Sequence, residues 1–174
     1  FANSFQTVTN PGLSRIKALC DALGNPEKKL RCIHIAGTNG KGSTSAMLDS
    51  ILREAGYRVG LYTSPFILRF NERIRVDGEE IPDADLAKIT EEIRPVAEAM
   101  EDRPTEFELI TAIAFEYFRR RGCQIVVLEC GLGGMIAASF YKPLAYGDNN
   151  AISDIFINTK KFFSKIVVIY FLFI

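Results

Sequence analysis

The sequence has no excess of either charge, because 21 lysine and arginine residues are balanced by 21 aspartate and glutamate residues in a chain of 174. Proteins that bind nucleic-acid backbones or anionic lipid usually carry a net basic field. The balance therefore argues against nucleic acid and against an anionic membrane as partners.

Long apolar runs and paired cysteines are also missing. The nine apolar residues at 166–174 are too few for a helix that crosses a bilayer, which takes about 20 residues. The N-terminus lacks the basic segment and apolar stretch of a secretory signal. The four cysteines form no C-x-x-C pair, so buried reduced thiols are expected at Cys20, Cys32, Cys123 and Cys130. These absences predict a cytoplasmic protein with no membrane partner.

What the chain does contain is typical of one globular domain, with 48% hydrophobic and 24% charged residues. Hydrophobic periodicity predicts strands at 30–36, 58–62 and 124–129, and a small hairpin at 73–78. Helices are expected at 10–23, 43–55, 83–100 and 105–122, the third bent or split at Pro95. This alternation predicts an α/β fold in which a parallel sheet is covered by helices. No heptad pattern or repeat appears, and a monomer is expected.

Two of the helices carry more specific expectations. The helix at 43–55 is expected to bury one apolar face, made of Met47, Leu48, Ile51, Leu52 and Ala55. The helix at 105–122 opens with the pattern of a capping box, in which Thr105 and Glu108 bond reciprocally. Both helices are therefore expected to pack against the sheet.

A glycine-rich turn follows the first predicted strand. Residues 35–44 read Ile-Ala-Gly-Thr-Asn-Gly-Lys-Gly-Ser-Thr. Gly37, Gly40 and Gly42 allow positive φ and a close approach of backbone N–H groups to an anion. Lys41 adds a full positive charge at the same place. The turn therefore predicts a site for nucleotide phosphates.

The helix after this turn, expected to begin near Ser43, adds its N-terminal N–H groups and the positive end of its dipole. Ser43 or Thr44 can offer a hydroxyl to Mg²⁺. The turn departs from the common G-x-x-x-x-G-K-[ST] pattern because Gly42 intervenes before the hydroxyl residue. The alternative is a glycine-rich strand-to-helix turn with no ligand.

An acid ends the last predicted strand. Ligands of open α/β sheets bind beyond the carboxyl ends of the strands, so Glu129 is expected beside the glycine-rich turn, where a carboxylate can hold Mg²⁺. The alternative is a strand-end glutamate in a surface salt bridge. His34, the only histidine, is expected within the first strand, where a core role is favoured over ligand binding.

Four stretches of the sequence form a recognisable set. They are Gly37-Thr-Asn-Gly-Lys-Gly-Ser43, Leu61-Tyr-Thr-Ser-Pro-Phe66 with Arg69-Phe-Asn-Glu-Arg-Ile74, Thr105-Glu-Phe-Glu108, and Leu128-Glu-Cys-Gly-Leu-Gly-Gly134. Over roughly residues 5–134 the chain resembles folylpolyglutamate synthase and the bifunctional dihydrofolate synthase, ATP-dependent ligases of the Mur superfamily. Peptidoglycan ligases of that superfamily share the phosphate loop, but the second stretch argues against them.

The resemblance implies a ligase that joins L-glutamate to dihydropteroate or a folate through an acyl phosphate, with ATP and Mg²⁺ as cofactors. It implies that Lys41 acts on the outer phosphates and that Ser64 and Glu129 ligate Mg²⁺. The loop at 65–73 would flank the pterin site, where Tyr62 and Phe66 either stack on the ring or pack. The residues that the resemblance implies for ATP binding are Gly37, Thr38, Asn39, Gly40, Lys41, Gly42, Ser43 and Thr44.

The resemblance stops at Gly134, so residues 1–134 are expected to form the N-terminal part of a Mur-type ATP-binding domain. Residues 135–174 lack the later histidine and lysine of the family and are an anomalous tail, explained by a shifted reading frame or a truncation. Alternatively the tail is real and its apolar end supplies a replacement strand. We expect the family's C-terminal glutamate ligase domain to be missing, and a non-catalytic nucleotide-binding remnant is the alternative function.

Overall fold

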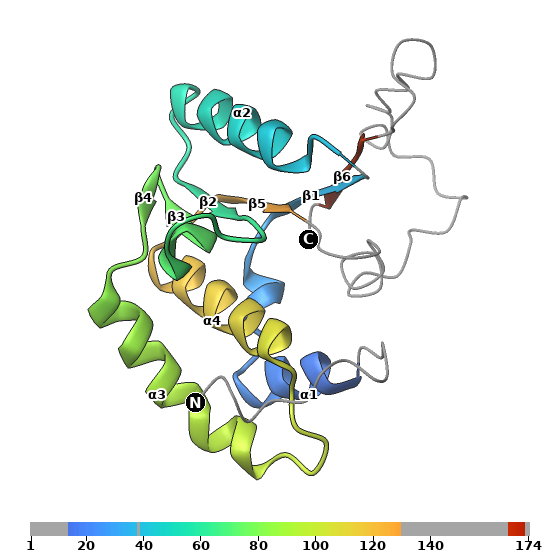
Figure 1. Cartoon of the computed structure of the whole chain (residues 1–174), viewed down its shortest axis with the longest axis vertical. Helices are drawn as coiled ribbons and strands as arrows, with labels where there is room; N and C mark the ends of the chain where they lie inside the picture. Colours follow the sequence, from blue (N-terminus) through green and yellow to red (C-terminus); the bar gives the residue numbers. More distant parts are fainter. Residues whose placement is uncertain (1–13, 38, 130–166, 173–174) are drawn as a thin grey trace.

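The computed structural model describes residues 14–37, 39–129 and 167–172 (Figure 1). The helices are α1 (Ser14–Ala22), α2 (Lys41–Glu54), α3 (Asp83–Ala99) and α4 (Glu106–Arg120), with two short 3-10 helices, η2 (Pro26–Lys29) and η3 (Phe70–Arg73). The strands are β1 (Cys32–Gly37), β2 (Val59–Tyr62), β3 (Ile74–Val76), β4 (Glu79–Glu80), β5 (Ile125–Glu129) and β6 (Val167–Leu172).

These strands form one sheet in the order β4-β3-β2-β5-β1-β6. The three central strands, β2, β5 and β1, are parallel, as the alternation of helices and strands predicts. The predicted α/β fold is confirmed, and the sheet is mixed because antiparallel strands flank the parallel centre. A tight hairpin adds β3 and β4 antiparallel to one edge, and β6 pairs antiparallel with β1 at the other.

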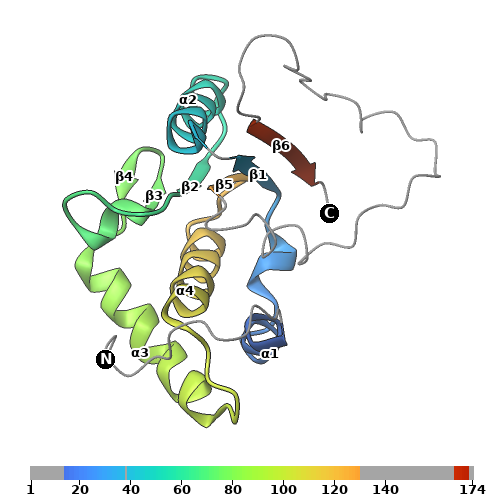
Figure 2. The ribbon, with the colours of Figure 1, turned by 45° about the vertical axis from the view of Figure 1, so that its right-hand side comes forward.

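The helices cover both faces of the sheet, with α2 on one side and α1, α3 and α4 on the other (Figures 1 and 2). Side chains of the strands alternate between the two layers because successive strand residues point to opposite faces. In β1, Cys32 joins the cluster under α1, α3 and α4, whereas Ile33 and Ile35 join the cluster with Leu48 and Leu52 of α2.

The predicted buried face of α2 is only partly correct. Met47 and Ile51 are 60% and 64% exposed, and Ala55 is exposed beyond the last turn. The face toward the sheet is instead made by Ser45, Leu48, Asp49 and Leu52. The spacing of these residues is equally helical, and apolarity alone does not reveal which of two overlapping faces meets the sheet.

The structure tests two helix predictions, the capping box of α4 and the effect of Pro95 on α3. The capping box of α4 is confirmed, since Thr105 Oγ1 accepts from the Glu108 N–H at 3.2 Å while the Glu108 carboxylate accepts from the Thr105 N–H at 2.7 Å. Pro95 is expected to bend or split α3, and the split does not occur because the helix continues to Ala99. Burial of Ile89, Ile93 and Ala97 on its inner face offsets the hydrogen bond that the proline cannot make.

The remaining predictions concern ends and turns. Asp77 and Gly78, both with positive φ (53° and 89°), close the predicted hairpin between β3 and β4. Cys20, Cys32 and Cys123 are buried thiols, as expected. Cys130, the N-terminal residues 1–13 and most of the tail lie outside the described residues. None of the described helices is long and apolar enough to cross a membrane.

Candidate nucleotide site

The central strands bring the predicted site residues to one edge of the sheet. β1, β2 and β5 are parallel and in close register, with Ile35 opposite Glu129 and Tyr62 opposite Leu128. Their carboxyl ends therefore lie together, as in other α/β sheets that bind ligands at this edge. The glycine-rich turn leaves β1 here, Ser64 follows β2, and Glu129 ends β5.

The glycine-rich turn is short. β1 ends at Gly37 and α2 begins at Lys41, two residues before the predicted start at Ser43. Gly40 caps the helix with φ 76°, a left-handed conformation that favours glycine. The Thr44 N–H bonds to the Gly40 carbonyl at 2.9 Å.

The early start of α2 changes which groups face a ligand. The first N–H groups of an α-helix have no acceptor within the helix, and here they belong to Lys41, Gly42 and Ser43. The positive end of the helix dipole lies at the same residues. Asn39 and Ser43 are exposed and Thr44 is half-buried. Thr38 lies outside the described residues.

Glu129 connects the three chain segments. Its Oε2 accepts the Ser64 N–H at 3.2 Å, and a Cβ built on Gly42 would lie 3.6 Å from the same oxygen. The Glu129 side chain therefore reaches both the loop after β2 and the first turn of α2. Because Glu129 is only 7% exposed, the alternative of a surface salt bridge is wrong.

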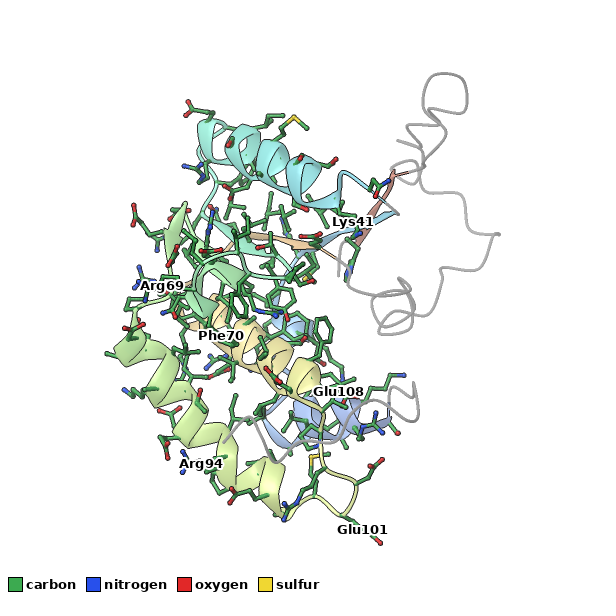
Figure 3. All side chains as sticks on the ribbon, viewed as in Figure 1. Lys41, Arg69, Phe70, Arg94, Glu101 and Glu108 are labelled. Carbon is green, nitrogen blue, oxygen red and sulfur yellow. The ribbon has the colours of Figure 1, made fainter. Side chains whose placement is uncertain are left out.

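Three effects act on the ionisation of the Glu129 carboxylate. Burial raises the pKa of Glu129, and the Ser64 N–H and the charge of Lys41 oppose that rise. A buried carboxylate pays a desolvation cost that a nearby cation offsets. Figure 3 shows Lys41 at the end of the sheet where the chain enters α2.

The composition of the site limits how a metal can be held. Within the part of the chain that the structure describes, no three His, Cys, Asp or Glu side chains form a metal cluster. A single carboxylate with hydroxyl groups and phosphate oxygens suits Mg²⁺, which prefers oxygen ligands and keeps several waters. The donors at this edge, Glu129 with the half-buried Ser64 and Thr44, fit that requirement.

Other predicted residues have structural roles. His34 is buried in β1, and burial lowers its pKa to about 4, so the favoured prediction of a core histidine is confirmed. Tyr62 is 3% exposed; its hydroxyl lies 3.3 Å from Thr111 Oγ1 and its ring packs at 6.2 Å from Phe107. The possibility that Tyr62 stacks on a ligand is therefore wrong.

The loop between Ser64 and η3 is well organised. The Thr63 N–H bonds to the Arg73 carbonyl at 3.0 Å and closes the loop at its base. The Arg73 guanidinium lies over the rings of Phe66 and Phe70, at 5.1 and 5.8 Å from their centroids. Phe66 itself is 43% exposed. The loop thus exposes the Phe66 ring two residues after Ser64, whose N–H bonds to Glu129.

One residue of this loop was not singled out from the sequence. Glu72 accepts hydrogen bonds from three consecutive backbone N–H groups, those of Ile67, Leu68 and Arg69. The only sequence signal is an acid three residues after Arg69, the N-cap of η3, which is the spacing of a capping box. A helix of four residues is too short for that signal to stand out.

The chain was compared with known proteins, and no protein-family model matches it. It is 50% identical over 129 residues to a dihydrofolate synthase/folylpolyglutamate synthase of Bacillus subtilis, an alignment that covers 71% of this chain and 30% of that protein.

Solved structures agree. A folylpolyglutamate synthase of Thermotoga maritima matches with a TM-score of 0.73 and 44% identity, over 78% of this chain and 33% of that one. A folylpolyglutamate synthase complex with AMPPCP and folate matches with a TM-score of 0.73 and 45% identity, over 76% and 34%. The chain spans about a third of the length of these relatives.

Proposed function

Because this chain belongs to the folylpolyglutamate synthase and dihydrofolate synthase family of Mur-type ligases, we propose that it carries the nucleotide site of an enzyme that joins L-glutamate to dihydropteroate or a folate. One observation carries the proposal most directly. The Glu129 carboxylate lies 3.2 Å from the Ser64 N–H and beside Gly42 at the first turn of α2. A buried acid, a phosphate-type turn and a substrate-type loop thus share one edge of the sheet.

The turn at 37–44 binds the phosphates of ATP in this proposal. The N–H groups of Lys41, Gly42 and Ser43 open α2 and point toward an anion. Lys41 places its charge on the outer phosphates, where charge develops during transfer. A relative in complex with the ATP analogue AMPPCP supports the choice of nucleotide.

Glu129 and Ser64 hold Mg²⁺ together with the phosphates, and Thr44 is a further hydroxyl within the same turn. The ion supplies positive charge that neutralises the phosphates during transfer. The observation behind this assignment is the buried Glu129 carboxylate, whose pKa is raised by burial. Such a group gains most from a divalent cation.

The chemistry of ligation assigns further tasks to the chain. A carboxylate becomes an acyl donor only after its oxygen is phosphorylated, and the amine of L-glutamate then displaces phosphate. Lys41 and the helix N-terminus stabilise the transferring phosphoryl group by fixed positive charge. The loop at 65–73 orients the pterin end of the acceptor in this proposal, because it exposes the Phe66 ring near Ser64; a relative that binds folate supports the substrate class.

Because the chain spans about a third of the length of these relatives, we propose two candidate functions for it. In the first candidate, residues 1–134 form part of the ATP-binding domain and the chain takes part in ligation. In the second, it binds nucleotide without catalysis.

Calorimetry with Mg-ATP tests the nucleotide site that both candidates share. We expect Lys41→Ala to weaken ATP binding by tenfold or more, roughly the value of one charged contact. Glu129→Gln should weaken binding only when Mg²⁺ is present. Lys29→Ala, which removes an exposed lysine of η2, is the matched control. Phosphate release with dihydropteroate and L-glutamate would identify the active ligase, and no ATP binding by the unaltered chain would refute both candidates.

A further inference from the structure

The loop after β2 exposes apolar side chains at its tip. Ile67 and Leu68 are each 87% exposed and Phe66 is 43% exposed, and they are consecutive in the chain. Contiguous exposed apolar residues on a monomeric protein commonly mark a binding surface. Ser64, which bonds to Glu129 at the nucleotide site, precedes Phe66 by two residues. Two residues of extended chain span at most about 7 Å, so the tip adjoins that site.

The tip has a defined backbone conformation because one carboxylate organises it. Glu72 Oε2 accepts the Ile67 N–H at 2.8 Å, and Glu72 Oε1 accepts the N–H groups of Leu68 and Arg69 at 3.0 and 3.1 Å. Both carboxylate oxygens are therefore used. Bonds from N–H groups to an ionised acceptor are stronger than those between neutral groups. The same three bonds keep the pKa of Glu72 below its usual range, which favours the ionised acceptor at neutral pH.

The base of the loop, in contrast, is fixed from other elements. The Asn71 amide donates to the Ile81 carbonyl at 2.6 Å and to Asp83 Oδ1 at 2.7 Å. The Arg69 guanidinium bonds Asp83 at 2.8 Å. These contacts tie η3 to the hairpin and to the start of α3. Glu72 therefore belongs to the fixed base of the loop, while its carboxylate bonds to the backbone of the tip. Arg69 and Phe70, which lie in the same loop, are labelled in Figure 3.

We propose that Glu72 is a positioning residue for the acceptor substrate, because its carboxylate holds the tip Phe66–Leu68 in the conformation that receives the aromatic end of a folate-type molecule. The proposal rests on the proposed function, which supplies the substrate class. Phe66 offers a ring already backed by the Arg73 guanidinium, and Ile67 and Leu68 offer apolar surface beside it. A preorganised apolar tip binds such a substrate without the cost of ordering the loop.

The test uses the full chain with Glu72→Ala and Glu72→Gln, and Glu79→Gln as the matched control. Glu79 is an exposed acid on β4 of the neighbouring hairpin. Hydrogen exchange of the Ile67, Leu68 and Arg69 amides reports the loop directly. Calorimetry with dihydropteroate in the presence of Mg-AMPPCP reports the acceptor site, and Mg-AMPPCP alone reports the nucleotide site.

We expect Glu72→Ala to speed exchange of those three amides and to weaken dihydropteroate binding by about tenfold, the scale of lost charged hydrogen bonds. Mg-AMPPCP binding should be unchanged. Glu72→Gln, which keeps one acceptor oxygen and the shape of the side chain, should give a smaller loss, and Glu79→Gln none. If Glu72→Ala does not fold, Glu72→Gln carries the comparison.

Three results would overturn the inference. Unchanged exchange of the three amides in both Glu72 variants would show that the carboxylate does not hold the tip. Faster exchange with unchanged dihydropteroate binding would show that the tip does not receive the acceptor. If the unaltered chain binds Mg-AMPPCP but no dihydropteroate, the proposed acceptor is itself wrong and the inference falls with it, an outcome distinct from the other two.

Discussion

Gly60 provides the most direct test of how the sheet and α4 fit together. A Cβ built at this position would lie 2.7 Å from Cδ1 of Phe118 and 3.0 Å from its Cγ and Cε1. Carbon atoms in contact ordinarily lie about 3.5–4.0 Å apart. Gly60→Ala therefore places a methyl group inside the space of the Phe118 ring.

The ring has little freedom to move away. Phe118 is 0% exposed and belongs to the cluster between the sheet and α1, α3 and α4. Overpacking of a well-filled core costs about 1–3 kcal/mol, while replacing glycine by alanine within a strand returns roughly 0.5–1 kcal/mol. We expect a net loss of about 1–2 kcal/mol in the free energy of unfolding.

Urea titration followed by circular dichroism measures this loss. With a denaturant slope of about 1–3 kcal/mol per molar for small proteins, the midpoint should fall by roughly 1 M. Ser50→Ala, at an exposed position of α2, is the control for an added alanine. Phe118→Leu and the double variant Gly60→Ala with Phe118→Leu complete the comparison. The double variant should lose less stability than the sum of the two single losses, because the effects of substitutions at residues in contact are not additive.

An undiminished midpoint in Gly60→Ala would refute the close approach of β2 and α4. Strict additivity of the two substitutions would refute Phe118 as the residue that fills the space.

Two further predictions concern buried ionisable groups. Glu108→Ala should lower the free energy of unfolding by roughly 3 kcal/mol, because it removes the buried partner of Arg15 at 3.0 Å and the acceptor of the Thr105 N–H. Glu106→Ala, at an exposed position in the same turn, is the control and should lower it little in the same urea titration. Equal losses in the two variants would contradict the role of the Arg15–Glu108 pair. Burial lowers the pKa of His34 to about 4, below its unfolded value of about 6.5. The unfolded chain therefore binds more protons between these values, and stability should fall by roughly 3 kcal/mol from pH 7 to pH 4. His34→Gln should remove that part of the pH dependence, and an unchanged slope of unfolding free energy against pH would contradict it.

The sequence predicted the individual elements well because their signals are local. The capping residues Thr105 and Glu108, the hairpin turn at Asp77-Gly78 and the alternation of apolar residues in β5 act within a few residues of chain. At the apolar end of the tail the structure has β6, the strand that was only the alternative to an anomalous tail. Interactions between residues that are close in the sequence depend only on residue type and spacing, so they can be predicted from the sequence alone.

The errors fall where long-range packing decides. Met47 and Ile51 of α2 face outward although they are apolar, because the sheet contacts the neighbouring face with Leu48 and Leu52. Pro95 does not split α3, because the contacts of Ile89, Ile93 and Ala97 hold the helix together. The orientation of a helix against its sheet depends on residues that are distant in the chain.

For the site, the sequence by itself determined the chemistry: a glycine-rich turn with Lys41, hydroxyl groups after it, and an acid at the end of a strand. Only the tertiary structure decided that Glu129 meets the Ser64 N–H and the first turn of α2, and that Glu72 organises the tip at 66–68. The physical reason is that residue types and spacing fix which groups can bind a ligand. Their convergence depends on the parallel register of β1, β2 and β5, which joins segments far apart in the chain.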